Sequence, residues 1–143
     1  MTRQTTLDMA AFIDAAPSPY HAVLAASERL DAAGFQRLDE AETWELGAGS
    51  YYMVRGGSLV AFALPEDVRP GMGLRVIGAH TDSPILRVKP RANTGRVGVR
   101  QLGVEIYGGA LLNSWLDRDL GLSGRAILRD ESDPTGQRSE LFL

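Results

Sequence analysis

Apolar residues repeat at helical spacing in two segments near the start of the chain. Leu7 to Ala16 carries apolar side chains on one face and ends before a proline, which predicts a first short helix. Ser18 then offers a capping hydroxyl, and Pro19 suits the first position of a second helix. The periodic segment Tyr20 to Ala33 follows and stops at Gly34, so we expect the second helix there.

Two β-rich runs follow a polar stretch. Tyr51 to Arg55 and Ser58 to Leu64 flank Gly56-Gly57, a pattern typical of a β-hairpin because glycine adopts positive φ at little cost. Aromatic and aliphatic side chains in and around these runs are expected to form core and cross-strand contacts. They are Trp44, Tyr51, Tyr52, Val60 and Phe62.

Further elements are predicted downstream. Leu74 to Ala79 is a short apolar run, which favours a buried strand. Leu86 to Pro90 and Arg96 to Tyr107 alternate between apolar and polar residues and are expected to be extended. Asn113 to Arg118 suggests a turn or short helical piece, and Leu120 to Leu128 a strand interrupted by glycines.

A candidate site lies where the apolar run of residues 74–79 ends. His80, Thr81 and Asp82 follow it directly, and in open α/β sheets ligands collect at the carboxyl ends of strands. In extended backbone, residues two apart project to the same side, so Asp82 can reach one ring nitrogen of His80 and leave the other for a metal. The alternative is a structural histidine followed by an Asp that begins the turn enforced by Pro84.

Composition limits the chemistry. The chain has 143 residues, 44% hydrophobic and 23% charged, with a net charge of −3, which fits a globular domain and not a basic nucleic-acid-binding surface. No apolar run is long enough to span a membrane and no secretion signal is seen, so we expect no membrane partner and a cytoplasmic location. With no cysteine, a metal must be held by histidine and carboxylates, and the only histidines are His21 and His80.

Other polar residues admit both a structural and a functional interpretation. His21 is expected to be structural because it lies in the first turn of a helix without a second ligand nearby. Glu105 suits an exposed strand face better than a general base, and the alternating cations of residues 87–91 suit the wet side of a strand better than an acidic substrate. Asp117 to Asp119 predicts a buried ion pair. Gly108-Gly109 indicates a backbone that passes close to a ligand or another strand.

Four sequence blocks occur in a characteristic order. They read P-S-P-Y-H-A-V, then G-A-H-T-D-S-P-I-L-R-V-K-P, then Q-L-G-V-E-I-Y-G-G, and finally W-L-D-R-D-L-G-L-S-G-R. Together they resemble the aspartyl aminopeptidase family of zinc metallopeptidases, and they extend over nearly the whole chain. The combination is far more specific than any single block.

The resemblance implies an α/β fold, with a mixed sheet and flanking helices. Residues 1–118 would form the amino-terminal part of the catalytic domain, and residues 119–143 the start of an inserted dimerisation domain. The family cleaves amino-terminal Asp or Glu from peptides, uses two zinc ions, and is expected to form homo-oligomers at full length. By resemblance, His80 is a metal ligand, Asp82 is the catalytic acid that orients it, and Gly108 and Gly109 lie near the substrate cleft.

The chain has too few convincing metal ligands for a complete zinc enzyme. A catalytic zinc needs about three protein ligands, and only His80 is convincing. We therefore expect the remaining ligands and the general base beyond Leu143, and an inactive isolated chain. An alternative is a non-catalytic interaction module built on the same scaffold. An unrelated metal hydrolase that uses H-x-D is weaker, because it leaves the other three blocks unexplained.

Overall fold

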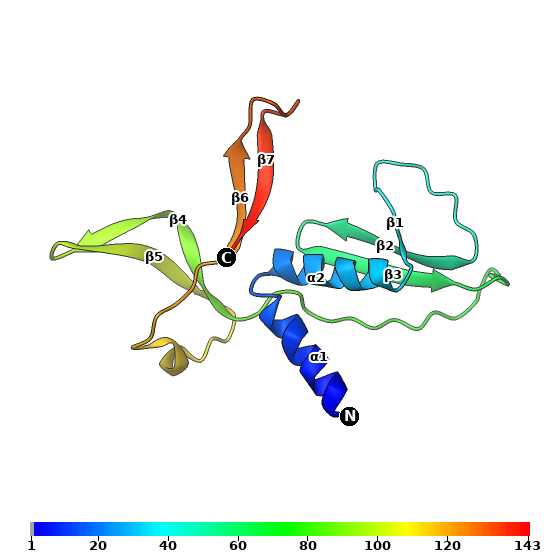
Figure 1. The fold of residues 1–143 in the computed structure, drawn as a ribbon, viewed down its shortest axis with the longest axis horizontal. Coiled ribbons are helices and arrows are strands. Elements are labelled where there is room, and N and C mark those ends of the chain that lie inside the picture. Colours follow the sequence, from blue (N-terminus) through cyan, green and yellow to red (C-terminus); the bar gives the residue numbers. More distant parts are fainter. Residues whose placement is uncertain (1) are drawn as a thin grey trace. The chain divides into compact units, whose positions relative to one another are not determined.

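The computed structural model describes residues 2–143, and Figure 1 labels their helices and strands. The chain divides into two compact units. The first comprises the residues up to Thr81 together with Leu122–Leu143, and the second comprises Asp82–Gly121. Helices flank a mixed sheet in the first unit, which confirms the α/β class and the mixed sheet expected from the sequence.

The first unit begins with two helices. α1 spans Arg3–Asp14, starting earlier than predicted because the Thr2 hydroxyl caps it by accepting from the Thr5 amide at 3.2 Å. α2 spans Pro19–Ala32 with Ser18 as its N-cap, as predicted, and Gly34 follows it at φ 81°. Among the helices of residues 2–143, none combines the length and apolar character needed to cross a membrane.

A three-stranded sheet lies against α2 (Figure 1). β1 (Gln36–Arg37) runs parallel to β2 (Gly49–Arg55), and β3 (Ser58–Leu64) runs antiparallel to β2. The hairpin predicted from Gly56-Gly57 is confirmed, with Gly56 at φ 57°. Gly57 does not have a positive φ, but it lies close to the start of α2, where a side chain would crowd Pro19.

The core of this unit centres on two consecutive tyrosines of β2. Tyr51 and Tyr52 are only 7% and 1% exposed, and because neighbouring side chains of a strand point to opposite faces, both faces of the sheet are covered there. The Tyr51 ring packs on its cross-strand partner Phe62 at 5.6 Å between centroids. Trp44 and Val60, predicted to join this core, are instead exposed, at 37% and 55%, and the Trp44 indole N–H donates to the Asp39 carbonyl.

The second unit contains a long hairpin and one short helix. β4 (Ile85–Arg96) pairs antiparallel with β5 (Val99–Tyr107), and η1 (Leu112–Trp115) overlaps the predicted helical piece. The extended segment expected from Arg96 to Tyr107 is confirmed from Val99 onward; it begins later than expected because the chain turns at Val97 and Gly98, both with positive φ. β4 also continues past Pro90 through a register shift between residues 88 and 93, which accommodates a residue without an N–H donor.

The chain ends in a third antiparallel pair, which belongs to the first unit. β6 (Gly124–Arg129) pairs with β7 (Gln137–Phe142), so the strand predicted from Leu120 begins later, at Gly124. The connecting turn is built by two carboxylates: Asp130 accepts from the Ser132 amide at 3.0 Å and Asp133 from the Thr135 amide at 2.8 Å. Hydrogen bonds from the side chains and amides of these two partners lower the pKa of both carboxyl groups.

The buried strand predicted for Leu74 to Ala79 is absent. The segment has no regular secondary structure, and the side chains of Leu74, Val76 and Ile77 are 86%, 85% and 97% exposed. An apolar run becomes a buried strand only when other strands pair with it and side chains cover it. Within residues 2–143 no strand pairs with this run, so its composition alone does not make it a strand.

We expect Tyr52→Phe to lower the free energy of unfolding by about 1–2 kcal/mol near pH 8, because the Tyr52 hydroxyl donates to Asp31 Oδ1 of α2 at 2.7 Å. This hydrogen bond and burial of the ring raise the pKa of Tyr52 above 10.0. The protonated phenol stabilises the fold below pH 10, and this contribution is lost as the pH rises through the raised pKa.

Urea unfolding at pH 8 and pH 11 measures both effects, with Tyr51→Phe as the matched control, since the Tyr51 hydroxyl contacts only backbone of Gly47 among its described partners. Equal loss of stability above pH 10 in the parent chain and in Tyr52→Phe would contradict this assignment.

Candidate metal centre

Within the H-T-D segment, Thr81 makes a hydrogen bond to the β2–β3 turn. Its hydroxyl donates to the carbonyl oxygen of Gly57, in the β2–β3 turn, at 2.6 Å. His80 precedes it and has an exposed side chain at the end of the irregular segment. An otherwise irregular stretch is thus fastened to the hairpin turn one residue after the predicted metal ligand.

The β2–β3 turn is in turn held against the start of α2. A Cβ added at Gly57 would lie 3.1 Å from Pro19 Cβ and 3.7 Å from the Tyr20 ring, which is a tight approach to the start of the helix. Ser123 Oγ also donates to the Pro17 carbonyl at 3.2 Å, and the Arg125 guanidinium lies 4.3 Å from the centre of the Tyr20 ring. The P-S-P-Y block therefore holds several elements of this unit together.

His21 has the structural role expected from the sequence. Its Nδ1 lies 2.8 Å from the Ser18 hydroxyl, and its backbone N–H donates to the same oxygen at 3.4 Å. Both contacts belong to the cap of α2.

Asp82 lies in the second unit, where a tyrosine of β5 contacts it. The Tyr107 hydroxyl donates to Asp82 Oδ2 at 2.6 Å, and this hydrogen bond is the main reason that the pKa of Tyr107 is raised. The Arg87 guanidinium lies 5.7 Å from the centre of the Tyr107 ring. Tyr107 was not predicted as a site residue, although it immediately precedes the two glycines that were.

The glycines after Tyr107 close the base of the same hairpin. Gly108 has φ 71°, and a Cβ there would lie 3.5 Å from Pro84, two residues after Asp82. The unit therefore brings Asp82, Tyr107 and Gly108 together. A Cβ added at Gly109 would have no atom within 4 Å apart from its own chain neighbours, so the surroundings of this glycine are open.

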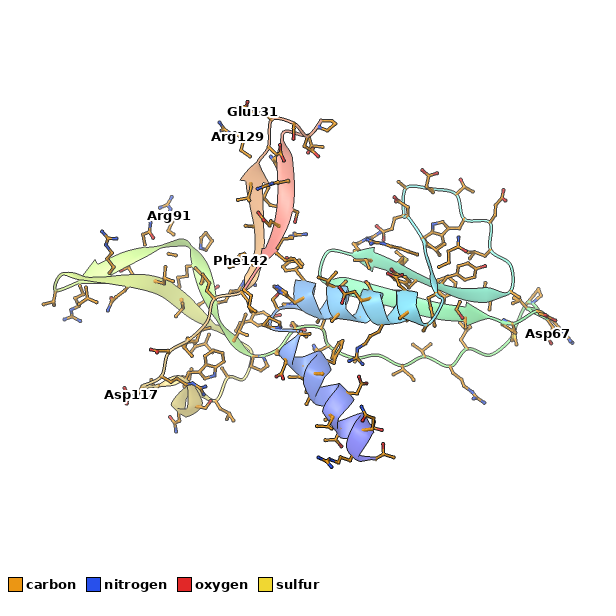
Figure 2. All side chains as sticks on the ribbon, viewed as in Figure 1. Asp67, Arg91, Asp117, Arg129, Glu131 and Phe142 are labelled. Atoms are coloured by element: carbon orange, nitrogen blue, oxygen red, sulfur yellow. The ribbon has the colours of Figure 1, made fainter. Side chains whose placement is uncertain are left out.

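The remaining charged candidates are exposed. Glu105 lies opposite Arg87 in the β4–β5 register, as expected for an exposed strand face. The buried ion pair predicted for Asp117 to Asp119 is wrong, because all three side chains are exposed, and Figure 2 shows Asp117 projecting from the ribbon. Arg118 instead donates to the Ser114 carbonyl at 3.4 Å, closing the turn after η1.

The metal-binding capacity of the described residues is partial. His80 offers an imidazole and Asp82 a carboxylate, which suit one zinc ligand and the acid that orients it. Residues 2–143 contain no group of three or more histidine, aspartate or glutamate side chains placed to hold a metal ion. The donor chemistry fits part of a zinc centre and requires further ligands.

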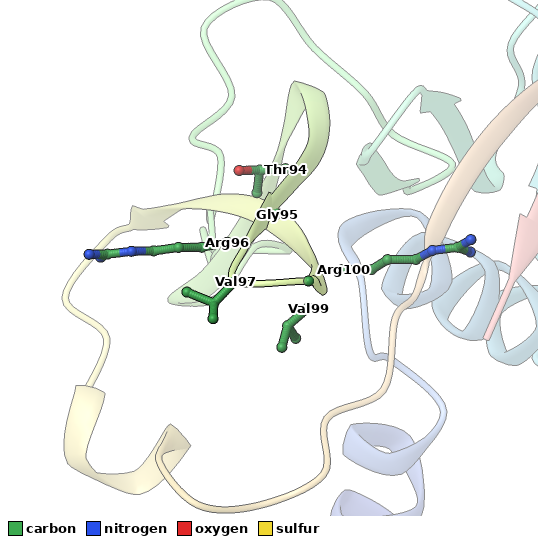
Figure 3. Close-up of a pocket in the computed structure, with 7 residues that line it drawn as sticks. Thr94, Gly95, Arg96, Val97, Val99 and Arg100 are labelled. Atoms are coloured by element: carbon green, nitrogen blue, oxygen red, sulfur yellow. The ribbon is translucent and has the colours of Figure 1, made fainter.

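A hollow of about 270 Å³ lies at the tip of the β4–β5 hairpin and involves none of these residues (Figure 3). Its lining is the turn of residues 94–100. Arg96 and Arg100 extend to opposite sides of the hairpin, so they do not converge on a bound anion (Figure 3). The hollow results from the turn and offers no cluster of catalytic groups.

Comparison with protein families identifies the chain. Residues 12–140 match the model of the aminopeptidase I zinc metalloproteases (M18). The chain is 57% identical over 130 residues to the "Probable M18 family aminopeptidase 2" of Streptomyces avermitilis and 47% identical over 131 residues to the aspartyl aminopeptidase of Aspergillus oryzae. These alignments cover 91% and 89% of the chain. The chain belongs to the M18 family of zinc aminopeptidases.

Solved structures show the same fold. Ape4, in its complex with Nbr1, superposes with a TM-score of 0.86 at 38% identity over 94% of this chain, and yeast aminopeptidase 1 with a TM-score of 0.86 at 33% identity over 96%. The chain spans only 30% of the Streptomyces relative and 26% of the Aspergillus relative. It therefore corresponds to the amino-terminal portion of the fold that these longer proteins share.

We expect Gly57→Ala to destabilise the first unit by about 1–3 kcal/mol, because the new methyl group would crowd Pro19 Cβ at 3.1 Å at the start of α2. Gly47→Ala is the matched control, since no atom outside its chain neighbours lies within 4 Å of a Cβ there and its φ is not positive. Thermal unfolding followed by circular dichroism measures the difference. Equal melting temperatures for the two variants would show that the contact between the turn and α2 is not tight.

Proposed function

We propose that this chain supplies the amino-terminal part of the catalytic region of an aminopeptidase that removes amino-terminal Asp or Glu from peptides. The observation that carries the proposal is the family match over residues 12–140, which includes His80 and Asp82 within the H-T-D segment. The acidic preference is supported by the name of the Aspergillus relative, an aspartyl aminopeptidase.

In this proposal His80 holds zinc through one ring nitrogen, and Asp82 fixes the imidazole through the other. Zinc, when bound, polarises the scissile carbonyl and makes a bound water more acidic. Gly108 and Gly109 contribute backbone to the wall of the substrate cleft, where the absence of side chains leaves room for a peptide. Two zinc ions occupy the complete centre, and further ligands from outside residues 2–143 complete it.

The complete protein is proposed to be a homo-oligomer. One structural neighbour is the mApe1 dodecamer of S. cerevisiae, which matches 92% of this chain with a TM-score of 0.82. A cytoplasmic location remains a prediction from the sequence.

The isolated 143-residue chain is expected to be inactive, because a single imidazole does not make a catalytic zinc site. Hydrolysis of an Asp-p-nitroanilide substrate, with and without added zinc, tests this directly. Turnover by the pure chain that a chelator abolishes would show that the described residues suffice for catalysis.

A chimera tests the function of the chain within a complete enzyme. We expect the aspartyl aminopeptidase of Aspergillus oryzae to stay active when this chain replaces its matching 131-residue segment. In the chimera His80→Ala should lower kcat/KM at least about a hundredfold, the upper end of the effect of losing an orienting group, because it removes a ligand itself.

The matched control is His21→Gln in the same chimera, which changes the only other histidine of the chain and leaves the metal centre intact. Equal activity of the His80→Ala and parent chimeras would exclude His80 as a zinc ligand. A folded but inactive parent chimera would favour a non-catalytic interaction module over an enzyme segment.

A further inference from the structure

The hydrogen bond from Thr81 to the β2–β3 turn joins residues 24 apart in the sequence. The Thr81 hydroxyl donates to the Gly57 carbonyl oxygen at 2.6 Å, and the bond is partly buried. His80, Thr81 and the turn that accepts the bond all belong to the first unit. The contact therefore fixes the chain one residue after the proposed zinc ligand, without involving the second unit.

The segment that leads to His80 has little support of its own. Within residues 2–143, no hydrogen bond or ion pair links residues 73–79 to another element, and the Ile77 side chain is 97% exposed. A segment with so few contacts opens at little cost in free energy. An imidazole at the end of such a segment keeps a fixed place only if the chain is anchored beside it.

Both partners of the Thr81 bond are restrained. Threonine branches at Cβ, so its χ1 angle has few accessible rotamers, and a fixed hydroxyl also fixes the backbone. Gly57 lies against the start of α2, where an added Cβ would be 3.1 Å from Pro19 Cβ. The bond therefore ties the backbone beside His80 to the hairpin turn, and through the turn to the helix.

We propose that Thr81 is a positioning residue, whose hydroxyl bond to the Gly57 carbonyl holds the backbone of His80 in the place from which its imidazole binds zinc. The inference rests on the proposed function, in which His80 is a zinc ligand. Thr81 does not contact the metal in this role and acts through the backbone that it shares with His80. Removal of a group that orients a metal ligand typically weakens metal binding about tenfold to a hundredfold.

The first test measures the order of the His80 backbone N–H in the 143-residue chain by nitrogen-15 NMR relaxation. We expect an order parameter of about 0.85 in the parent and below about 0.6 in Thr81→Val, which keeps the branched shape but lacks the hydroxyl. Thr81→Ser, which keeps the hydroxyl, should stay near the parent. A low order parameter in the parent, or an equal one in Thr81→Val, would overturn the proposal.

The second test measures the zinc affinity of the Aspergillus chimera by competition with a chelator. Thr81→Val should weaken zinc binding about tenfold, and Thr81→Ser should restore most of the affinity. The matched control is Thr6→Val, which removes a hydroxyl that also donates to a backbone carbonyl, that of Thr2 at 3.3 Å. Its zinc affinity should equal that of the parent chimera.

A double-mutant cycle separates positioning from a general effect on stability. If Thr81 acts through His80, Thr81→Val should not weaken zinc binding further once His80→Ala has removed the ligand. Equal losses in the two backgrounds would contradict the proposal, assign Thr81 a purely structural role and leave the zinc role of His80 intact. Unchanged zinc binding in His80→Ala alone would overturn the role of His80 and, with it, that of Thr81.

Discussion

The close contact between Gly57 and Pro19 is the constraint on which the first unit depends. The hairpin turn approaches the first turn of the helix so closely that a methyl group at Gly57 would crowd Pro19, which ties the turn to the start of α2. The same helix start receives Ser123 and Arg125 from the β6 segment. The Gly57 carbonyl, held in this way, then accepts the Thr81 hydroxyl and fixes the residue that follows His80.

Asp82, the residue after Thr81, is held by a separate hydrogen bond. Asp82 belongs to the other unit and is held by Tyr107 at the base of β4–β5. Thr81 and Asp82 are neighbours in sequence, so the two residues after His80 are each fastened by a separate piece of structure. The P-S-P-Y, H-T-D and Y-G-G blocks thus each supply one of these contacts.

Short sequence motifs correctly predicted the features that depend on adjacent residues, namely a helix start and a hairpin turn. Ser18 and Pro19 placed the start of α2, and Gly56-Gly57 placed the hairpin, because caps and turns depend on a few adjacent residues. The buried strand at Leu74 to Ala79 failed because strand formation depends on distant partners that periodicity does not reveal. Tyr107 was missed for the same reason, since alternation indicates the face of a side chain and not its partner 25 residues away.

The role proposed for His80 is that of a zinc ligand in an M18 metal centre to which this chain contributes the first part. Zinc-edge anomalous diffraction from crystals of the zinc-loaded chimera locates the ion relative to this imidazole without relying on activity. We expect an anomalous peak about 2.0–2.1 Å from one His80 ring nitrogen, with Asp82 at the other. A fully occupied zinc centre with the His80 ring outside its coordination sphere would refute this role.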